Sequence, residues 1–206
     1  MNARYDPAAL TRIAEKLTVL RRLADEDGSG VVIGPPEPLE PLPDLPGVAE
    51  VYSLFDRLEG NNFRFLPPPQ TRTPAAWAAH LVNPDDPMGS PLVVGKEIRS
   101  VPAGLRDAIA GGDPIYLDLE DLDVYWMEPD DYVWQYKHPD DDVPFTVIAP
   151  DLATFFDRYV LGPGYPELVA IVLGDVARDE RLRRGRHAGR YADSWRRLLI
   201  TAGLSD

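Results

Sequence analysis

The 206-residue sequence contains no cysteine and only three lysines, against eighteen arginines. The absence of cysteine excludes disulfide scaffolds, zinc ribbons, iron–sulfur clusters and thiol catalysis. No run approaches eighteen consecutive apolar residues, so we expect no contact with a membrane through a spanning helix. The first residues, MNARYDPAAL, lack the apolar centre of a secretory signal. These absences predict a cytoplasmic protein, and the excess of arginine over lysine is typical of a GC-rich bacterial genome.

Positive charge is also scarce. The formal net charge is −13, from 34 acidic and 21 basic residues, and 44% of the side chains are hydrophobic. Phosphate backbones are bound by clustered Lys and Arg, so we expect no direct nucleic-acid binding. Residues 178–206 differ from the rest, because they carry eight arginines against four acids. This segment either docks on the acidic body or binds an acidic partner, and Trp195, Leu198 and Leu199 favour docking because they need a surface to bury against.

Motifs of the common enzymes and cofactor sites are missing. No Ser lies in a G-x-S-x-G elbow, and the three histidines form no metal-binding pair such as H-E-x-x-H. Gly111 and Gly112 precede an expected strand, whereas a phosphate-binding loop follows a strand and opens a helix. We therefore expect no serine hydrolase, no histidine-based metal site and no nucleotide-binding loop.

Helical periodicity is clear at both ends of the sequence. Asp6 caps a helix that Gly28 stops, with Leu10, Ile13, Leu17 and Leu20 on one face. A proline-rich connector follows over residues 29–46, and an interaction ligand is the alternative interpretation of this segment. Further helices are expected over these residues: 48–58, a patch at 75–81, 101–110, 152–161, 165–184 and 191–202.

The central part of the sequence has the alternation of β-strands. Ile115, Leu117 and Leu119 alternate with polar or aromatic neighbours. Strands are expected at residues 63–66, 92–98, 115–119, 124–128, 132–137 and 146–148. Short connections favour an antiparallel meander. The predicted fold class is therefore α+β, with N-terminal helices, a central antiparallel β-sheet meander and C-terminal covering helices. We expect a domain over residues 1–162 and a C-terminal Arg-rich helical extension over 163–206, packing on it.

The region from Asp118 to Asp142 contains ten acids and one Lys, interleaved with tyrosine and tryptophan. Three interpretations stay open. The rings form a sheet core, or they anchor a protein partner that the acids steer, or paired carboxylates serve a hydrolase or hold a metal ion. The candidate partner-binding residues are Glu120, Asp121, Asp123, Tyr125, Asp130, Asp131, Tyr132, Trp134, Asp140, Asp141 and Asp142. In this interpretation Tyr132, Trp134 and Tyr136 share one face of a strand.

Several short motifs resemble the SUKH superfamily, the Smi/Knr-like family of yeast cell-wall-synthesis regulators and bacterial toxin-immunity proteins. The residues that carry the resemblance are Leu45-Pro46, the expected helix from Val48 to Leu58, the turn Glu59-Gly60-Asn61, Val94-Gly95, the segment from Gly112 to Leu119, Val124-Tyr125-Trp126, and Ile148-Ala149 with Leu152, Phe155 and Phe156. The match covers roughly residues 6–162. The proline-rich segment 67–91 and the Arg-rich tail depart from the family's usual core.

The resemblance implies an α+β fold without catalytic residues, which acts by binding another protein. We therefore expect a chain that is not an enzyme and that uses no cofactor and no metal. In bacteria that partner is often a toxin, and toxin domains with a basic nucleic-acid cleft are suited to an acidic inhibitor. We therefore expect an immunity protein that neutralises a cognate, basic bacterial toxin domain. The alternative is a regulatory or scaffold protein of the same fold with a different protein partner. A carboxylate-dependent hydrolase or metal-binding protein is a further alternative.

Overall fold

The computed structural model describes residues 6–27, 30–42, 45–80, 91–102, 112–138, 141 and 143–206. Among these residues, seven strands form one sheet in which every neighbouring pair is antiparallel and the spatial order follows the chain. The strands are β1 (Val32–Ile33), β2 (Leu58–Glu59), β3 (Phe63–Phe65), β4 (Leu92–Glu97), β5 (Pro114–Leu117), β6 (Val124–Trp126) and β7 (Thr146–Ala149). The α+β class and the meander are thus confirmed.

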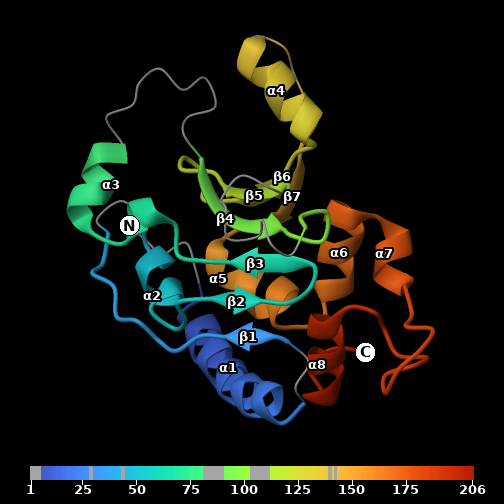
Figure 1. Cartoon of the computed structure of the whole chain (residues 1–206). Helices are drawn as coiled ribbons and strands as arrows, with labels where there is room; N and C mark the ends of the chain where they lie inside the picture. The colour runs from blue at the N-terminus through green and yellow to red at the C-terminus, as the bar shows by residue number, and fades with distance from the viewer. Residues whose placement is uncertain are drawn as a thin grey trace.

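The helices pack mainly on one face of this sheet, and α4 stands apart at the top of the molecule (Figure 1). The helical elements are α1 (Pro7–Asp27), α2 (Val48–Tyr52), the 3-10 turn η1 (Pro69–Thr71), α3 (Pro74–His80), α4 (Pro129–Lys137), α5 (Leu152–Thr154), the π-helix η3 (Phe155–Val160), α6 (Tyr165–Leu173), α7 (Asp175–Asp179) and α8 (Ser194–Thr201). In the described part of the chain, no helix is long and apolar enough to cross a membrane.

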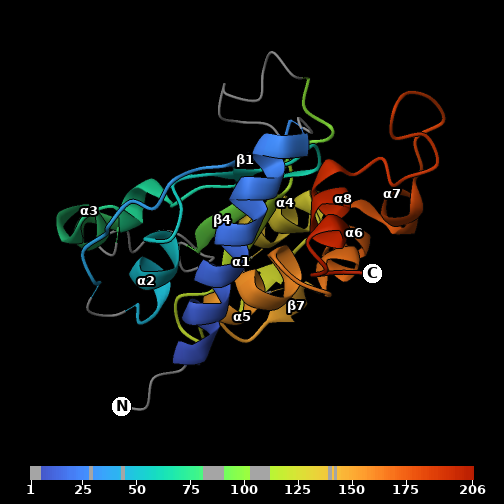
Figure 2. The same cartoon turned by 90° about the horizontal axis from the view of Figure 1, so that it is seen from below.

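The core lies between the sheet and the helices. Ile115 and Leu117 of β5 are fully buried on this side, and Ile13 and Leu17 of α1 are buried against the same cluster. Figure 2 shows α1 running across the molecule, close to α5 and α8. The apolar stripe predicted for α1 is therefore the stripe that enters the core, as expected for an amphipathic helix.

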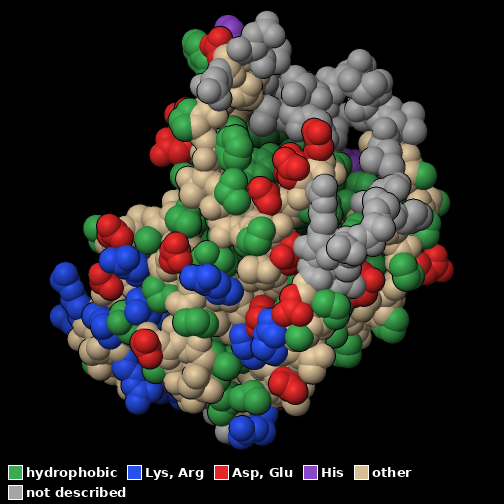
Figure 3. Space-filling view, turned by 180° about the vertical axis from the view of Figure 1, so that it is seen from behind, with side chains coloured by type: hydrophobic (Ala, Val, Ile, Leu, Met, Phe, Trp, Pro, Cys, Tyr) green, Lys and Arg blue, Asp and Glu red, His purple; other side chains and the backbone are tan. Residues whose placement is uncertain are grey.

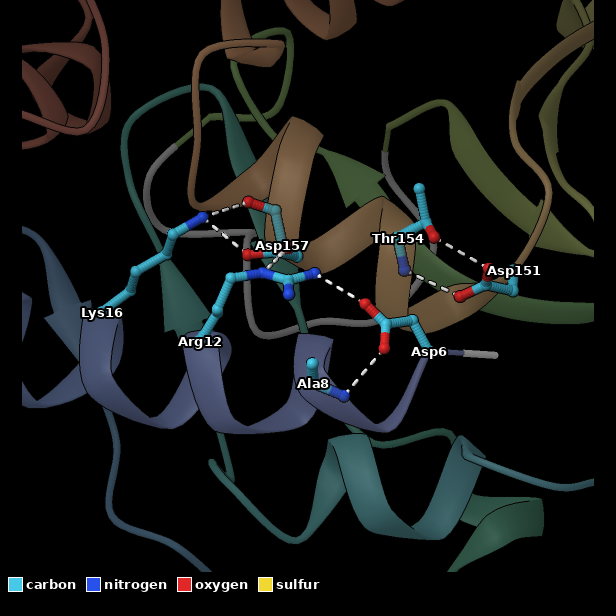
Figure 4. Close-up of polar contacts among 7 residues, drawn as sticks. All are labelled: Asp6, Ala8, Arg12, Lys16, Asp151, Thr154 and Asp157. Carbon is cyan, nitrogen blue, oxygen red and sulfur yellow. Dashed lines mark hydrogen bonds and ion pairs between the residues drawn. The ribbon is translucent and has the colours of Figure 1, made fainter. Parts of the chain in front are cut away.

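The junction of α5 and η3 is held to α1 by charge. Figure 4 shows Arg12 and Lys16 reaching Asp157, with Arg12 Nε 2.8 Å and Lys16 Nζ 2.6 Å from the carboxylate oxygens. Lys16 Nζ also donates to the backbone oxygen of Asp157 at 2.6 Å. Asp151 caps α5 by accepting from Thr154 N at 2.7 Å. These contacts fix the covering helices on α1, so this cluster has a structural role.

The C-terminal segment packs on the body. Trp195, Leu198 and Leu199 of α8 are buried in the common core, and Trp195 Nε1 donates to Val160 O at 2.8 Å. The buried carboxylate of Asp193 accepts from both Asn62 Nδ2 and Tyr165 Oη at 2.8 Å. This segment is therefore joined to the β2–β3 turn and to α6 through polar as well as apolar contacts.

Three predicted elements are wrong. The helix expected from Val48 ends at Tyr52, because the backbone must extend before Leu58 enters β2. The helix expected over residues 165–184 ends at Leu173, where Gly174 has a φ of 81° that a helix does not allow, and α7 resumes for one turn. Residues 132–137 are part of α4 and form no strand. Most of the helix expected over residues 101–110 lies outside the described residues.

Candidate partner-binding surface

Helix α4 contacts the sheet face that points away from the core through the ring of Tyr132. The ring of Tyr132 stacks on Tyr116 of β5, with centroids 5.2 Å apart and an interplanar angle of 6°. Tyr116 in turn stacks on Tyr125 of β6, its register partner, at 5.4 Å. We call Tyr116, Tyr125 and Tyr132 the tyrosine stack. Stacked rings at these separations stabilise each other beyond their area of burial, so the stack holds α4 against the sheet.

Large apolar side chains around the tyrosine stack are exposed to solvent. Phe145 is 57% exposed, and its ring packs edge-on against Tyr125 at 5.5 Å. Val147, the β7 register partner of Tyr125, is 48% exposed. On the outward side of α4, Val133 and Trp134 are 49% and 52% exposed. We call Val133, Trp134, Phe145 and Val147 the exposed apolar surface. Figure 3 shows hydrophobic side chains reaching the surface below α4.

The indole of Trp134 is held in place although half of it is exposed. Its Nε1 donates to Asp141 Oδ2 at 2.9 Å, and its ring lies 4.3 Å from that of His138. Gln135 Nε2 also donates to Asp141 O at 2.9 Å. A fixed aromatic side chain loses little conformational entropy on binding, which is the property of an anchor residue.

The predicted acidic residues fall into two groups. Asp130 is exposed and Asp131 is half-buried in the first turn of α4, where negative charge suits the helix dipole, and Asp141 lies beside Trp134. Exposed Glu120 and Asp121 and half-buried Asp123 lie in the β5–β6 turn. The carboxylate of Asp118 orders that turn by accepting from the backbone N of Glu120 and Asp121. Asp140 and Asp142 lie outside the described residues.

The two groups lie at opposite ends of the β5–β6 hairpin. The turn that holds Glu120, Asp121 and Asp123 joins the end of β5 to the start of β6, whereas α4 begins after β6 ends. Only the α4 group, Asp130, Asp131 and Asp141, therefore shares an end of the hairpin with Tyr132 and Trp134. Tyr125 is 7% exposed and contributes by supporting its neighbours.

Further carboxylates increase the negative charge at the α4 end of the hairpin. Burial, together with the nearby charges of Glu97 and Glu128, raises the pKa of Asp113. Burial also raises the pKa of Tyr116, so its hydroxyl stays protonated. Within the residues that the structure describes, no three His, Asp or Glu side chains are grouped in a way that holds a metal ion. The arrangement presents apolar side chains framed by negative charge.

Helix α4 replaces the predicted strand and changes which rings share a face. A strand places residues 132 and 134 on one side, but in a helix they point about 200° apart. Tyr132 accordingly faces the sheet and Trp134 faces solvent. Pro129 at the first helical position, Asp130 and Asp131 in the first turn and Lys137 in the last are all helix signals that identify this element.

Three members of the exposed apolar surface were not among the predicted site residues: Val133, Phe145 and Val147. Phe145 and Val147 are two residues apart, at the start of a strand at the edge of the sheet. This spacing puts both on one face, and such a pair before the buried Ile148 and Ala149 is the available signal.

No protein-family model matches the chain, and neither a curated protein nor a solved structure is significantly similar to it. The resemblance to the SUKH superfamily therefore stays a prediction.

Proposed function

We propose that this chain is a non-catalytic binding protein that neutralises a basic protein, a bacterial toxin domain, by covering it. The observation that carries the proposal is the exposed apolar surface, whose four side chains are each about half exposed, next to the acidic first turn of α4. Exposed apolar patches framed by charge mark interaction sites, and tryptophan is enriched among residues that dominate binding energy.

The acids and the rings contribute at different stages of binding. Asp130, Asp131 and Asp141 attract a positively charged surface and accelerate the first encounter. Trp134 and Phe145 then lose their exposed area against the partner. The net charge of −13 supports a basic partner, because the excess of acidic residues attracts positively charged proteins.

The proposal is tested by capture and protection. The immobilised chain captures proteins from a lysate of its source organism, and each captured protein is then expressed alone in a host cell. We expect a basic protein that arrests growth, and co-expression of the unaltered chain restores growth. If the captured protein is not toxic, the chain is not an immunity protein. The regulatory or scaffold function then takes precedence.

Double variants separate the contribution of the exposed rings from that of the acidic residues. Trp134→Ser with Phe145→Ser removes both exposed rings, and we expect the affinity to fall by roughly 30-fold or more, which corresponds to about 2 kcal/mol. Asp130→Asn with Asp131→Asn slows association at low salt. Glu120→Gln with Asp121→Asn makes the same charge change at the other end of the hairpin and leaves the association rate nearly unchanged. If both acidic pairs change the association rate equally, the partner does not bind at the α4 end of the hairpin.

A further inference from the structure

The segment after α7 forms a basic hairpin. Ala192 N donates to Glu180 O at 2.9 Å, and Leu182 N donates to Arg190 O at 2.9 Å, so residues 180–192 turn back on themselves. We call them the arginine hairpin. Its arginines are Arg181, Arg183, Arg184, Arg186 and Arg190. In Figure 3, Lys and Arg side chains gather on the side of α7 and α8, away from α4.

The base of the arginine hairpin is stiffened by a stacked tyrosine. The guanidinium carbons of Arg181 and Arg196 lie 3.3 Å and 3.5 Å from the ring centroid of Tyr191. Two guanidinium groups at such distances cannot share one face, so they lie on opposite faces of the ring. Arg196 is 7% exposed and is fixed by donating to Arg178 O at 2.7 Å. Arg181 is therefore held on the outer face of an anchored ring, in a cation–π contact.

A depression of about 410 Å³ lies beside this stack, lined by Arg181, Arg190, Tyr191, Arg197 and Thr201. Arg197 is held from behind, because its Nη1 donates to Tyr191 O and Ala192 O at 2.7 Å and 2.9 Å. Its Nε is buried and has no hydrogen-bond partner in the described part of the chain. Arg181 and Arg190 form no ion pair with any carboxylate that the structure describes. Three guanidinium groups thus line one depression, and no acidic side chain is among the described residues that line it.

The chemistry of this depression selects a multiply charged anion. Guanidinium groups match the oxygens of phosphate in geometry and charge, and three of them together favour a ligand with several negative charges. A volume of several hundred Å³ is that of a small-molecule site. Both faces of Tyr191 are already occupied by arginines, so this ring is not free to stack on a nucleobase. Recognition therefore acts on the phosphate groups.

We propose that the depression binds a phosphate-bearing small molecule through Arg181, Arg190 and Arg197. The site is separate from the exposed apolar surface and does not depend on the function proposed above. Because the ligand is held by its phosphates, inorganic pyrophosphate and ATP bind with similar affinity, and succinate, a dianion without phosphate, binds at least ~10-fold more weakly.

Isothermal titration calorimetry on the full chain at low salt tests this proposal, with pyrophosphate, ATP, succinate and a short single-stranded oligonucleotide as probes. Arg190→Gln removes a charge from the depression, and we expect it to weaken pyrophosphate binding by about 10-fold, or ~1.4 kcal/mol. Arg184→Gln removes the same charge from an exposed residue that does not line the depression, and it changes the affinity by less than ~2-fold. The side chains of Arg184 and Arg190 are exposed, so both variants fold.

Four results overturn the proposal. They are no measurable heat with pyrophosphate or ATP, equal losses in Arg184→Gln and Arg190→Gln, binding of succinate as tight as that of pyrophosphate, and binding of the oligonucleotide alone. The last result would assign the arginine hairpin to a nucleic-acid backbone.

Discussion

The carboxylate of Asp193 joins the C-terminal segment to the rest of the molecule, and its removal is expected to destabilise the fold strongly. Its Oδ1 caps α8 by accepting from Trp195 N at 2.9 Å and Arg196 N at 3.3 Å. Its Oδ2 accepts from Asn62 Nδ2 and Tyr165 Oη, both at 2.8 Å and both buried. Asp193→Ala therefore removes one helix cap and leaves two buried donors without an acceptor.

The magnitude follows from these contacts. Loss of an N-cap costs about 1 kcal/mol, and each buried donor left unpaired costs about 1–3 kcal/mol. The buried charge that disappears with the side chain offsets part of this sum. We expect Asp193→Ala to lower the free energy of unfolding by about 3–5 kcal/mol, and the Tm by roughly 10 °C, measured by urea and thermal unfolding. A loss below about 1 kcal/mol would show that Asp193 does not pair with these buried donors.

Asp193→Asn is the matched control and gives a pH test. The amide oxygen keeps the cap, so the loss in stability is smaller. Burial raises the pKa of Asp193 above its ordinary value of 3.8. The folded chain then binds this proton more tightly than the unfolded chain, and stability falls as the pH rises from 3.8 through the raised pKa. We expect the parent chain to lose stability relative to Asp193→Asn over this interval. A constant difference between the two proteins contradicts the assignment.

Two further predictions concern contacts within the fold. Asp157→Asn weakens the contacts with Arg12 and Lys16, and the Asp157 side chain is only 13% exposed. We expect the free energy of unfolding to fall by about 1–2 kcal/mol, measured by urea unfolding. Arg72→Gln in the exposed pair with Glu37 is its control and changes stability by less than about 0.5 kcal/mol. Gly112→Ala places a Cβ 1.6 Å from Glu97 O at a φ of +94°, and we expect a loss of at least about 2 kcal/mol by thermal unfolding. A Gly112→Ala variant that is as stable as the parent chain contradicts the backbone conformation at Gly112. The control is Gly185→Ala, at a φ of +87° with no atom within 4 Å of the added Cβ, and we expect it to lose less stability.

Local sequence patterns were sufficient to predict an element when only one of its faces enters the core. The stripe of α1 and the alternation of β5 gave these elements and their buried faces directly. Strand β1 has only two residues, Val32 and Ile33, within a proline-rich segment, so no local pattern marks it. It forms because β2 offers a pairing edge, which is a tertiary cause.

The candidate site was predicted in part, for a similar reason. The alternating aromatics of residues 132–136 fit a strand by propensity, but Pro129 and the charges at the two ends make a helix, and the tyrosine stack then fixes its orientation. Phe145 and Val147 look like core residues in the sequence. Their spacing places both on one face of β7, but only the packing of the helices against the opposite face, which holds Ile148, decides that this face stays exposed.

Site-specific photocrosslinking shows whether a basic partner covers the exposed apolar surface. A photoreactive phenylalanine analogue replaces Trp134 in one protein and Val176 in another. Val176 is 88% exposed but belongs to α7, away from this surface. We predict a crosslink to one basic protein from position 134 and none from position 176. A crosslink to that protein from position 176 alone, or with equal yield from both positions, would show that the partner does not bind at the exposed apolar surface.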